Sequence, residues 1–121
     1  MALNRVLIIE DDAGIREALA ECVASFEVTV TTACDGAEGL ERLRAGPVPD
    51  AVLLDLRMAR LDGDGVFAAL AGDPALRETA VVAMTGSPDR EKVPVHAFLQ
   101  NPFDLDELAK VFLHLGHQNQ A

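Results

Sequence analysis

The stretch Val6-Leu7-Ile8-Ile9-Glu10-Asp11-Asp12 places three acidic residues directly after a short apolar run. An apolar run of this length, rich in β-branched residues, is typical of a strand that is buried on both faces of a sheet. Carboxylates this close together repel one another, so a fold keeps them together mainly to hold a hard cation. The stretch therefore predicts a buried strand that ends at a cation site.

A second apolar run, Ala51-Val52-Leu53-Leu54, also ends in an acidic residue, Asp55. Two buried strands that both deliver carboxylates at their carboxyl ends indicate one site built across two strands. Apolar runs alternate with helical patterns along the whole chain, which is typical of βα units and a parallel sheet. The five predicted strands are Arg5–Ile9, Val28–Ala33, Ala51–Asp55, Ala80–Thr85 and Ala97–Gln100.

The predicted fold class is α/β, with a doubly wound, five-stranded parallel sheet of order 2-1-3-4-5. A helix is expected between the last two strands, but Pro88 and Pro94 bracket a segment too short for a stable helix. We therefore expect a loop or a single turn over Gly86–His96, so that the fourth helix is degenerate or missing.

Ligands of an open parallel sheet bind at the carboxyl ends of the strands, where the strand order reverses. The predicted order puts Glu10, Asp11 and Asp55 together at that point, with Thr85 and Asn101 further along the same rim. Oxygen-only ligands select Mg²⁺ or a similar hard ion. A carboxylate beside Mg²⁺ can act as a nucleophile toward phosphorus, so this set of residues suits phosphoryl transfer to Asp55.

The bulk composition limits the partners and the location of the chain. Its 121 residues predict one domain over residues 1–121, with no output domain attached. The formal net charge of −10 argues against direct binding to nucleic acid or to an anionic membrane. No apolar run approaches a membrane span and no signal-peptide pattern is present, so we expect a cytoplasmic protein. Cys22 and Cys34 are expected to be buried free thiols in a reducing compartment.

Five ordered motifs resemble the response regulator receiver domain of two-component signalling, a flavodoxin-like fold. They are Ile8-Ile9-Glu10-Asp11-Asp12, Leu53-Leu54-Asp55-Leu56-Arg57-Met58, Leu61-Asp62-Gly63, Ala83-Met84-Thr85 and Asn101-Pro102-Phe103. The resemblance covers nearly the whole chain, and the spacings from Asp11 to Asp55 and from Asp55 to Thr85 are usual for the family.

The resemblance implies a role for each matching residue. Asp55 is implied as the phosphoacceptor, and Mg²⁺ as the cofactor, bound by Asp11, Asp55 and the Arg57 main-chain carbonyl. Glu10 is implied to act on the ion through water. The implied donor is the phosphohistidine of a histidine kinase or phosphotransfer protein, and the implied output is binding to an effector protein. The domain is then no enzyme beyond its own phosphorylation and dephosphorylation.

Other positions are implied to switch the domain and to time its signal. Thr85 is implied to bond the phosphoryl group and to carry the switch, with Phe98 as its aromatic rotamer partner. Arg57 and Ser87 are implied to line the path of the attacking water and to tune dephosphorylation.

Three departures from the family pattern bear on this interpretation. Asn101 stands where the family has an active-site Lys, Ala59 stands in place of a Pro, and the segment between Thr85 and Phe98 is several residues short. A neutral amide donates weaker hydrogen bonds than an ammonium, so we predict slower phosphorylation, weaker coupling to the switch, or both. Lys92 is an alternative source of the missing charge, and the family pattern predicts a cis peptide before Pro102.

Two other functions compete with a phosphorylated receiver. A pseudo-receiver, working as an interaction module with little dependence on phosphorylation, is favoured by Asn101 and the short fourth-helix segment. A flavodoxin-like cofactor binder or a phosphatase is disfavoured, because acids follow the first strand and Asp55-Leu56-Arg57 lacks the second Asp of an Asp-x-Asp motif.

Overall fold

A computed structural model describes residues 3–56, 65–76, 78–85, 95–100 and 103–118. Its five strands pair in parallel in the order β2-β1-β3-β4-β5, which confirms the predicted topology. The strands are β1 (Arg5–Ile9), β2 (Thr29–Ala33), β3 (Ala51–Asp55), β4 (Ala80–Thr85) and β5 (Ala97–Gln100). Their bounds differ from the prediction only in β2, which begins one residue later than expected.

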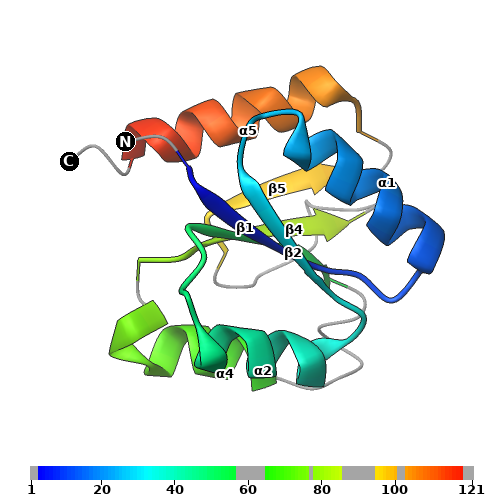
Figure 1. Cartoon of the computed structure of the whole chain (residues 1–121). Coiled ribbons are helices and arrows are strands. Elements are labelled where there is room, and N and C mark those ends of the chain that lie inside the picture. The colour runs from blue at the N-terminus through cyan, green and yellow to red at the C-terminus, as the bar shows by residue number, and fades with distance from the viewer. Residues whose placement is uncertain (1–2, 57–64, 77, 86–94, 101–102, 119–121) are drawn as a thin grey trace.

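Helices cover both faces of this sheet (Figure 1). The described helices are α1 (Ala13–Ala24), α2 (Gly36–Ala45), α4 (Gly65–Gly72), the short 3-10 helix η1 (Pro74–Leu76) and α5 (Leu105–Gln118). Helices α1 and α5 lie on one face, and α2 and α4 lie on the other (Figure 1). The prediction of a degenerate or missing helix falls on residues 86–94, outside the described residues.

Burial along the strands follows from this two-sided cover. Successive side chains point to opposite faces, so a strand with helices on both sides buries every residue. In β1, Val6 and Ile8 join the core on the α1/α5 side, whereas Leu7 and Ile9 join the core on the α2/α4 side. Strand β2 lies at the edge of the sheet and instead alternates between exposed and half-buried residues up to its last residue, the buried Ala33.

Helix starts gather at the carboxyl ends of the strands, as the parallel topology requires. Three of these helices follow an aspartate whose Oδ1 accepts the backbone N–H three residues further on. The distances are 2.9 Å from Asp12 to Ile15, 2.8 Å from Asp35 to Glu38 and 2.9 Å from Asp104 to Glu107. These bonds cap the three helices and fix where each helix leaves the rim that carries the site.

The sequence wrongly predicted the environment of several apolar side chains. Cys22 and Cys34 are both exposed free cysteines and not buried thiols. Cys22 lies about 100° round the helix from the buried Val23, at the margin of the face that packs on the sheet. The helical spacing of apolar residues in the sequence predicts that Ile15 and Leu105 face inward. They are instead 52% and 50% exposed, and each lies in the first turn of its helix.

Asp50, which precedes β3, connects several strands by hydrogen bonds at the amino end of the sheet. Its Oδ2 accepts the backbone N–H groups of Asn4 at 2.7 Å and of Arg5 at 2.9 Å. Its own N–H donates to the carbonyl of Arg5 at 2.8 Å, and its carbonyl accepts from Ala80 N at 3.0 Å. One aspartate thus ties together the beginnings of β1, β3 and β4.

A buried threonine completes this end of the molecule. Thr79 is 3% exposed, and its hydroxyl donates to the carbonyl of Pro49 at 2.8 Å. The bond joins the segment before β4 to the segment before β3.

No helix in the described part of the chain has the length and apolar character needed to cross a bilayer.

Candidate functional site

Two acidic segments lie level with each other at the carboxyl ends of β1 and β3. The register pairs Ile9 with Leu54, so that Glu10 follows the end of β1 just where Asp55 ends β3. The Glu10 N–H continues the pairing on the other side, donating to Ala33 O of β2 at 3.1 Å. The predicted meeting of the two acidic segments is therefore a direct result of the strand order.

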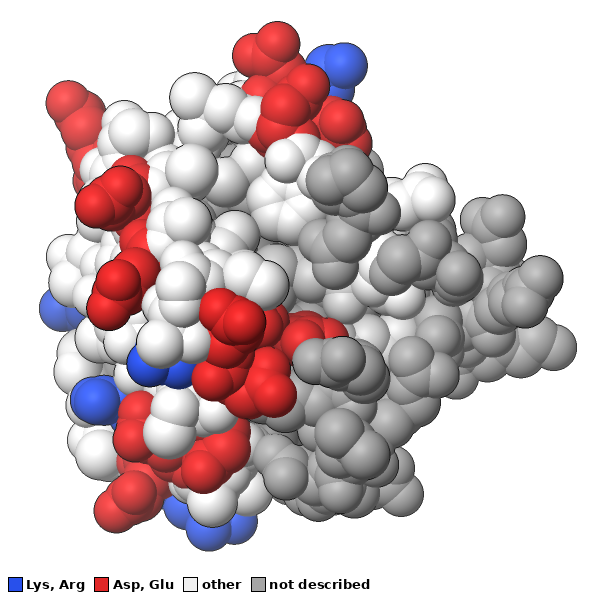
Figure 2. Space-filling view, turned by 90° about the vertical axis from the view of Figure 1, so that its right-hand side faces the viewer, with Lys and Arg blue, Asp and Glu red and all other residues white. Residues whose placement is uncertain are grey.

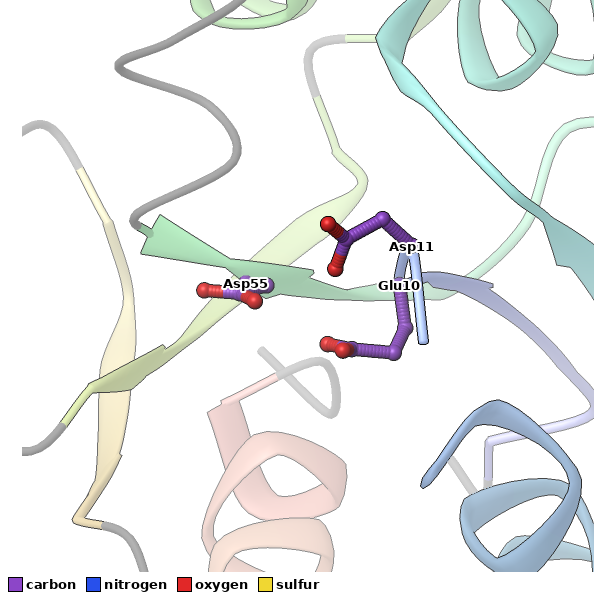
Figure 3. A group of neighbouring side chains, drawn as sticks. All are labelled: Glu10, Asp11 and Asp55. Carbon is purple, nitrogen blue, oxygen red and sulfur yellow. The ribbon is translucent and has the colours of Figure 1, made fainter. Parts of the chain in front are cut away.

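One carboxylate oxygen from each of Glu10, Asp11 and Asp55 can be chosen so that all three atoms lie within 4.8 Å of one another. Figure 3 shows the side chains of Glu10 and Asp11 reaching from the end of β1 toward Asp55 on β3. Glu10 is buried, at 4% exposed, whereas Asp55 is half-buried and Asp11 is exposed. The cluster offers three hard oxygen ligands at one place, and Asp11 is its solvent-exposed member.

The electrostatics of Glu10 are those of a buried acid beside like charges. Burial, followed by the charge of Asp55, raises the pKa of Glu10 from 4.5 to about 7. The Asp12 N–H, which donates to Glu10 Oε1 at 3.3 Å, lowers this pKa but does not cancel the rise. Burial and the neighbouring Asp55 both disfavour the charged form of Glu10. A divalent cation would favour that charged form, so the site suits such an ion.

The acidic triplet divides into two functions. Asp12 caps α1 through its bond to Ile15 N. Glu10 and Asp11 are the members that face Asp55 (Figure 3). The cap has an indirect effect on the site, because it sets the direction in which the chain leaves the end of β1.

Thr85 and Phe98 lie on the two strands that follow along the rim. The register pairs Asp55 with Met84, so Thr85, which is 7% exposed, comes one residue further along β4. Phe98 of β5 is half-buried and pairs with Ala83. Strand alternation places Thr85 and Phe98 on the same face of the sheet, two residue positions apart in register.

Several predicted site residues lie outside the described residues. They are Arg57, Ser87, Lys92 and Asn101, together with the predicted cis peptide before Pro102. The roles assigned to these four residues stay predictions, as do the roles assigned to the site residues that the structure describes.

Sequence reasoning missed one residue that touches the site segment. Arg16, in the first turn of α1, donates from Nη1 to the main-chain carbonyl of Glu10 at 2.9 Å. The available signal was its place four residues after the cap Asp12, one helical turn into α1. A long side chain there lies close enough to reach back to the strand end.

The described surface around this end of the molecule is acidic. Figure 2 shows many Asp and Glu side chains and few Lys or Arg side chains on the face that contains the strand ends. The acidic residues at and near the helix starts are Asp12, Asp35, Glu38, Asp104, Asp106 and Glu107. They follow from helix capping and from the preference of acids for helix N-termini.

The comparisons with known proteins agree with this architecture. The chain is 37% identical over 108 residues to the "Response regulator MprA" of Mycobacterium ulcerans, covering 86% of this chain and 46% of that protein. It is 28% identical over 122 residues to the "Hybrid signal transduction histidine kinase D" of Dictyostelium discoideum, covering 96% of this chain and 8% of that protein. Among solved structures, the chemotaxis response regulator CheY4 of Vibrio cholerae superposes with a TM-score of 0.83 at 22% identity, covering 94% and 99% of the two chains.

The fold is thus that of a CheY-like doubly wound α/β domain with an acidic rim. The family model of the response regulator receiver domain matches residues 6–112, and the chain belongs to this family. It is a receiver domain of two-component signalling. The chain spans about half the length of the MprA proteins that it matches.

Proposed function

We propose that this domain accepts a phosphoryl group on Asp55, with Mg²⁺ bound beside it, and signals through phosphorylation-dependent protein binding. The observation that carries the proposal is the meeting of Glu10, Asp11 and Asp55 at the ends of two neighbouring strands. Family membership supports the same chemistry. The gathered carboxylates also favour it over a pseudo-receiver, which has no need to hold three mutually repelling acids together.

Each acid has its own proposed task. Asp11 and Asp55 would bind Mg²⁺ directly, together with the Arg57 main-chain carbonyl, and Glu10 would act mainly through water. When bound, the ion supplies charge neutralisation at the attacking and phosphoryl oxygens. The raised pKa of Glu10 supports this assignment, because a buried acid beside Asp55 gains most from a nearby cation.

The proposed reaction is a direct phosphoryl transfer from a phosphohistidine. An Asp55 carboxylate oxygen attacks phosphorus, an O–P bond forms, and the N–P bond to the donor imidazole breaks. The imidazole leaves with the electron pair of that bond and takes up a proton. The half-buried position of Asp55 at the end of β3 suits an in-line approach from the open side of the rim.

Thr85 and Phe98 would convert the phosphoryl group into a change of shape. The Thr85 hydroxyl would bond a phosphoryl oxygen, and Phe98, on the same sheet face, would change rotamer with it. Arg57 and Ser87 would line the path of the water that removes the group. Asn101 would donate a neutral hydrogen bond where the family has a Lys.

The partners follow from membership in the family. Response regulators interact with histidine kinases and with downstream effectors. We propose a histidine kinase or phosphotransfer protein as the donor and a protein as the effector. The acidity of the rim in Figure 2 disfavours nucleic acid or an anionic membrane at this face.

The direct test is phosphorylation with a small donor. Wild-type protein incubated with Mg²⁺ and acetyl phosphate should gain one phosphoryl group by mass, and beryllofluoride should shift amide signals at the rim. Asp55→Asn should abolish the adduct, whereas Asp106→Asn, on an exposed position of α5, should leave it unchanged. No adduct and no Mg²⁺ binding at millimolar donor would overturn the proposal.

A second variant tests the assignment of Asn101. Restoring the charge in Asn101→Lys should speed phosphorylation or enlarge the amide shifts, because charge-assisted hydrogen bonds are roughly twice as strong as neutral ones. Equal rates and equal shifts in the two proteins would show that Asn101 does not limit the switch.

A further inference from the structure

The side chain of Arg16 differs from its neighbours in the first turns of α1. Residues Asp12 to Ile15 before it and Glu17 after it are exposed, whereas Arg16 is half-buried. Its Nη1 donates to the main-chain oxygen of Glu10 at 2.9 Å. The guanidinium is therefore turned back from the helix onto the end of β1.

The main-chain carbonyl of Glu10 accepts no hydrogen bond from β2, because β2 ends too early to supply the donor. Glu10 N donates to Ala33 O on β2 at 3.1 Å, and in a parallel ladder the next donor to the carbonyl of Glu10 would also come from β2. Strand β2 ends at Ala33, and Arg16 donates to this carbonyl. The arginine extends the hydrogen bonding of the sheet by one residue, at the position that carries the first site carboxylate.

Other hydrogen bonds close the same turn. Arg16 N donates to Asp12 O at 2.8 Å, and Asp12 N donates to Glu10 Oε1 at 3.3 Å. The main-chain N–H of Arg16 thus holds the cap residue Asp12, while its side chain holds Glu10. Asp11 lies between these two anchored residues, so the directions of both the Glu10 and Asp11 side chains depend on this turn.

We propose that Arg16 is a positioning residue for the metal-binding carboxylates, holding the turn that carries Glu10 and Asp11 in the geometry that accepts Mg²⁺. This role rests on the proposed function. Arg16 contacts the main-chain oxygen of Glu10, so its proposed action is to hold the turn through this hydrogen bond.

The two possible actions of Arg16 predict opposite results. If its charge mattered most, removing a cation next to a cation site would strengthen Mg²⁺ binding. If its hydrogen bond matters most, removing it loosens the turn and weakens Mg²⁺ binding. Losses of partners that orient metal ligands commonly cost about tenfold or more in affinity, so we expect a roughly tenfold weaker Mg²⁺ affinity in Arg16→Met.

The experiment is a Mg²⁺ titration of metal-free protein followed by amide NMR, because the chain has no Trp or Tyr to report by fluorescence. Arg16→Met removes both the charge and the hydrogen bond, whereas Arg16→Lys keeps a charged N–H donor on a side chain of similar length. Arg44→Met, at an exposed position in the last turn of α2, removes one charge far from the turn and serves as the matched control.

We expect Mg²⁺ affinity to fall in Arg16→Met, to recover in part in Arg16→Lys, and to stay unchanged in Arg44→Met. Phosphorylation of Arg16→Met by acetyl phosphate should return toward the wild-type rate at saturating Mg²⁺, which a loss of folded protein would not produce. Amide spectra give the folded fraction, and affinities refer to that fraction.

Unchanged or stronger Mg²⁺ binding by Arg16→Met would overturn the role of Arg16 and leave the proposed function intact. Equal losses in the Lys and Met variants would overturn the hydrogen-bond mechanism, because Lys keeps an N–H donor of similar reach. A wild-type protein that binds no Mg²⁺ would overturn the proposed function itself, and the role of Arg16 with it.

Discussion

At the amino end of the sheet, Asp50 accepts two backbone N–H groups, whereas at the carboxyl end the carboxylates of Glu10, Asp11 and Asp55 lie within reach of one ion. Both sets of acids sit beside β1 and β3, and they differ in what surrounds them. Around Asp50 the backbone supplies donors, so the charge stabilises the fold. At the carboxyl end, the three carboxylates repel one another, which lowers the stability of the folded protein, and a bound cation would offset this repulsion. Side-chain type alone thus does not separate a structural acid from a functional one; the neighbouring donors do.

The largest effect should come from removing one acid of the cluster. We expect Asp11→Asn to weaken Mg²⁺ binding by about 100-fold, because a proposed direct ligand loses its charge. The stability of the metal-free protein should stay equal or rise, because a repulsive charge is gone. Mg²⁺ titration by amide NMR and thermal unfolding in a chelator measure the two quantities. A large loss of metal-free stability would place Asp11 with Asp50 as a structural acid.

The opposite result is expected at the amino end. Asp50→Ala should lower the free energy of unfolding by about 1–3 kcal/mol, because Asn4 N and Arg5 N lose their acceptor. Mg²⁺ affinity of the folded protein should not change. Asp50→Asn keeps an amide oxygen at this position and should lose less, which denaturant unfolding of the two variants will show. Weakened Mg²⁺ binding in Asp50→Asn would mean that the two ends are coupled.

The raised pKa of Glu10 should make the free energy of unfolding depend on pH. Because folding raises the pKa of Glu10 from 4.5 to about 7, the unfolded state binds fewer protons between these values. The free energy of unfolding of metal-free protein should therefore fall as the pH rises from about 4.5 to 7, by at most about 1.4 kcal/mol per pH unit for this one proton. Below that range the contribution is fully present.

The difference between wild type and Glu10→Gln isolates this contribution, with Glu17→Gln on the exposed side of α1 as the control. Unfolding is followed in chelator at a series of pH values, and again with saturating Mg²⁺, which should remove the fall. A pH-independent difference between wild type and Glu10→Gln would contradict the assigned electrostatics.

The smallest effect should come from Thr79, a neutral group at the amino end. Thr79→Val keeps the shape but loses the hydroxyl bond to Pro49 O, which should cost about 1 kcal/mol of unfolding free energy. Thr79→Ser keeps the hydroxyl and loses the methyl group instead, so it measures the contribution of the methyl group. If Thr79→Val unfolds like the wild type, the hydroxyl bond adds nothing.

The fold could be predicted from sequence because buried parallel strands leave a strong pattern. Uninterrupted apolar runs such as Val6–Ile9 and Ala51–Leu54 stand out from helical periodicity, and each has a sharp polar end. The convergence of Glu10 and Asp11 with Asp55 then follows from strand order alone. The first turns of helices were less predictable, because periodicity gives the direction of a side chain but not whether the sheet still extends beneath it, as Ile15 and Leu105 show.

The contacts that sequence could not supply join positions that no local pattern relates. Arg5 and Asp50 are 45 residues apart, and their bond depends on the register of two strands. The bond from Arg16 to Glu10 O depends on the angle at which α1 leaves the strand. The depth of Glu10, which raises its pKa, likewise depends on the packing around the strand end.

The strand order also has a consequence for the path of folding. Strand β1 pairs with β2 on one side and with β3 on the other, so the two halves of the acidic site come together only when β3 docks against β1. Closing that connection carries the entropy cost of a long loop, and bringing Asp55 up to Glu10 adds charge repulsion to it. The proposed Mg²⁺ site is complete only after this docking step. Excess Mg²⁺ should therefore act chiefly by slowing the unfolding of the folded domain, with little effect on the folding rate.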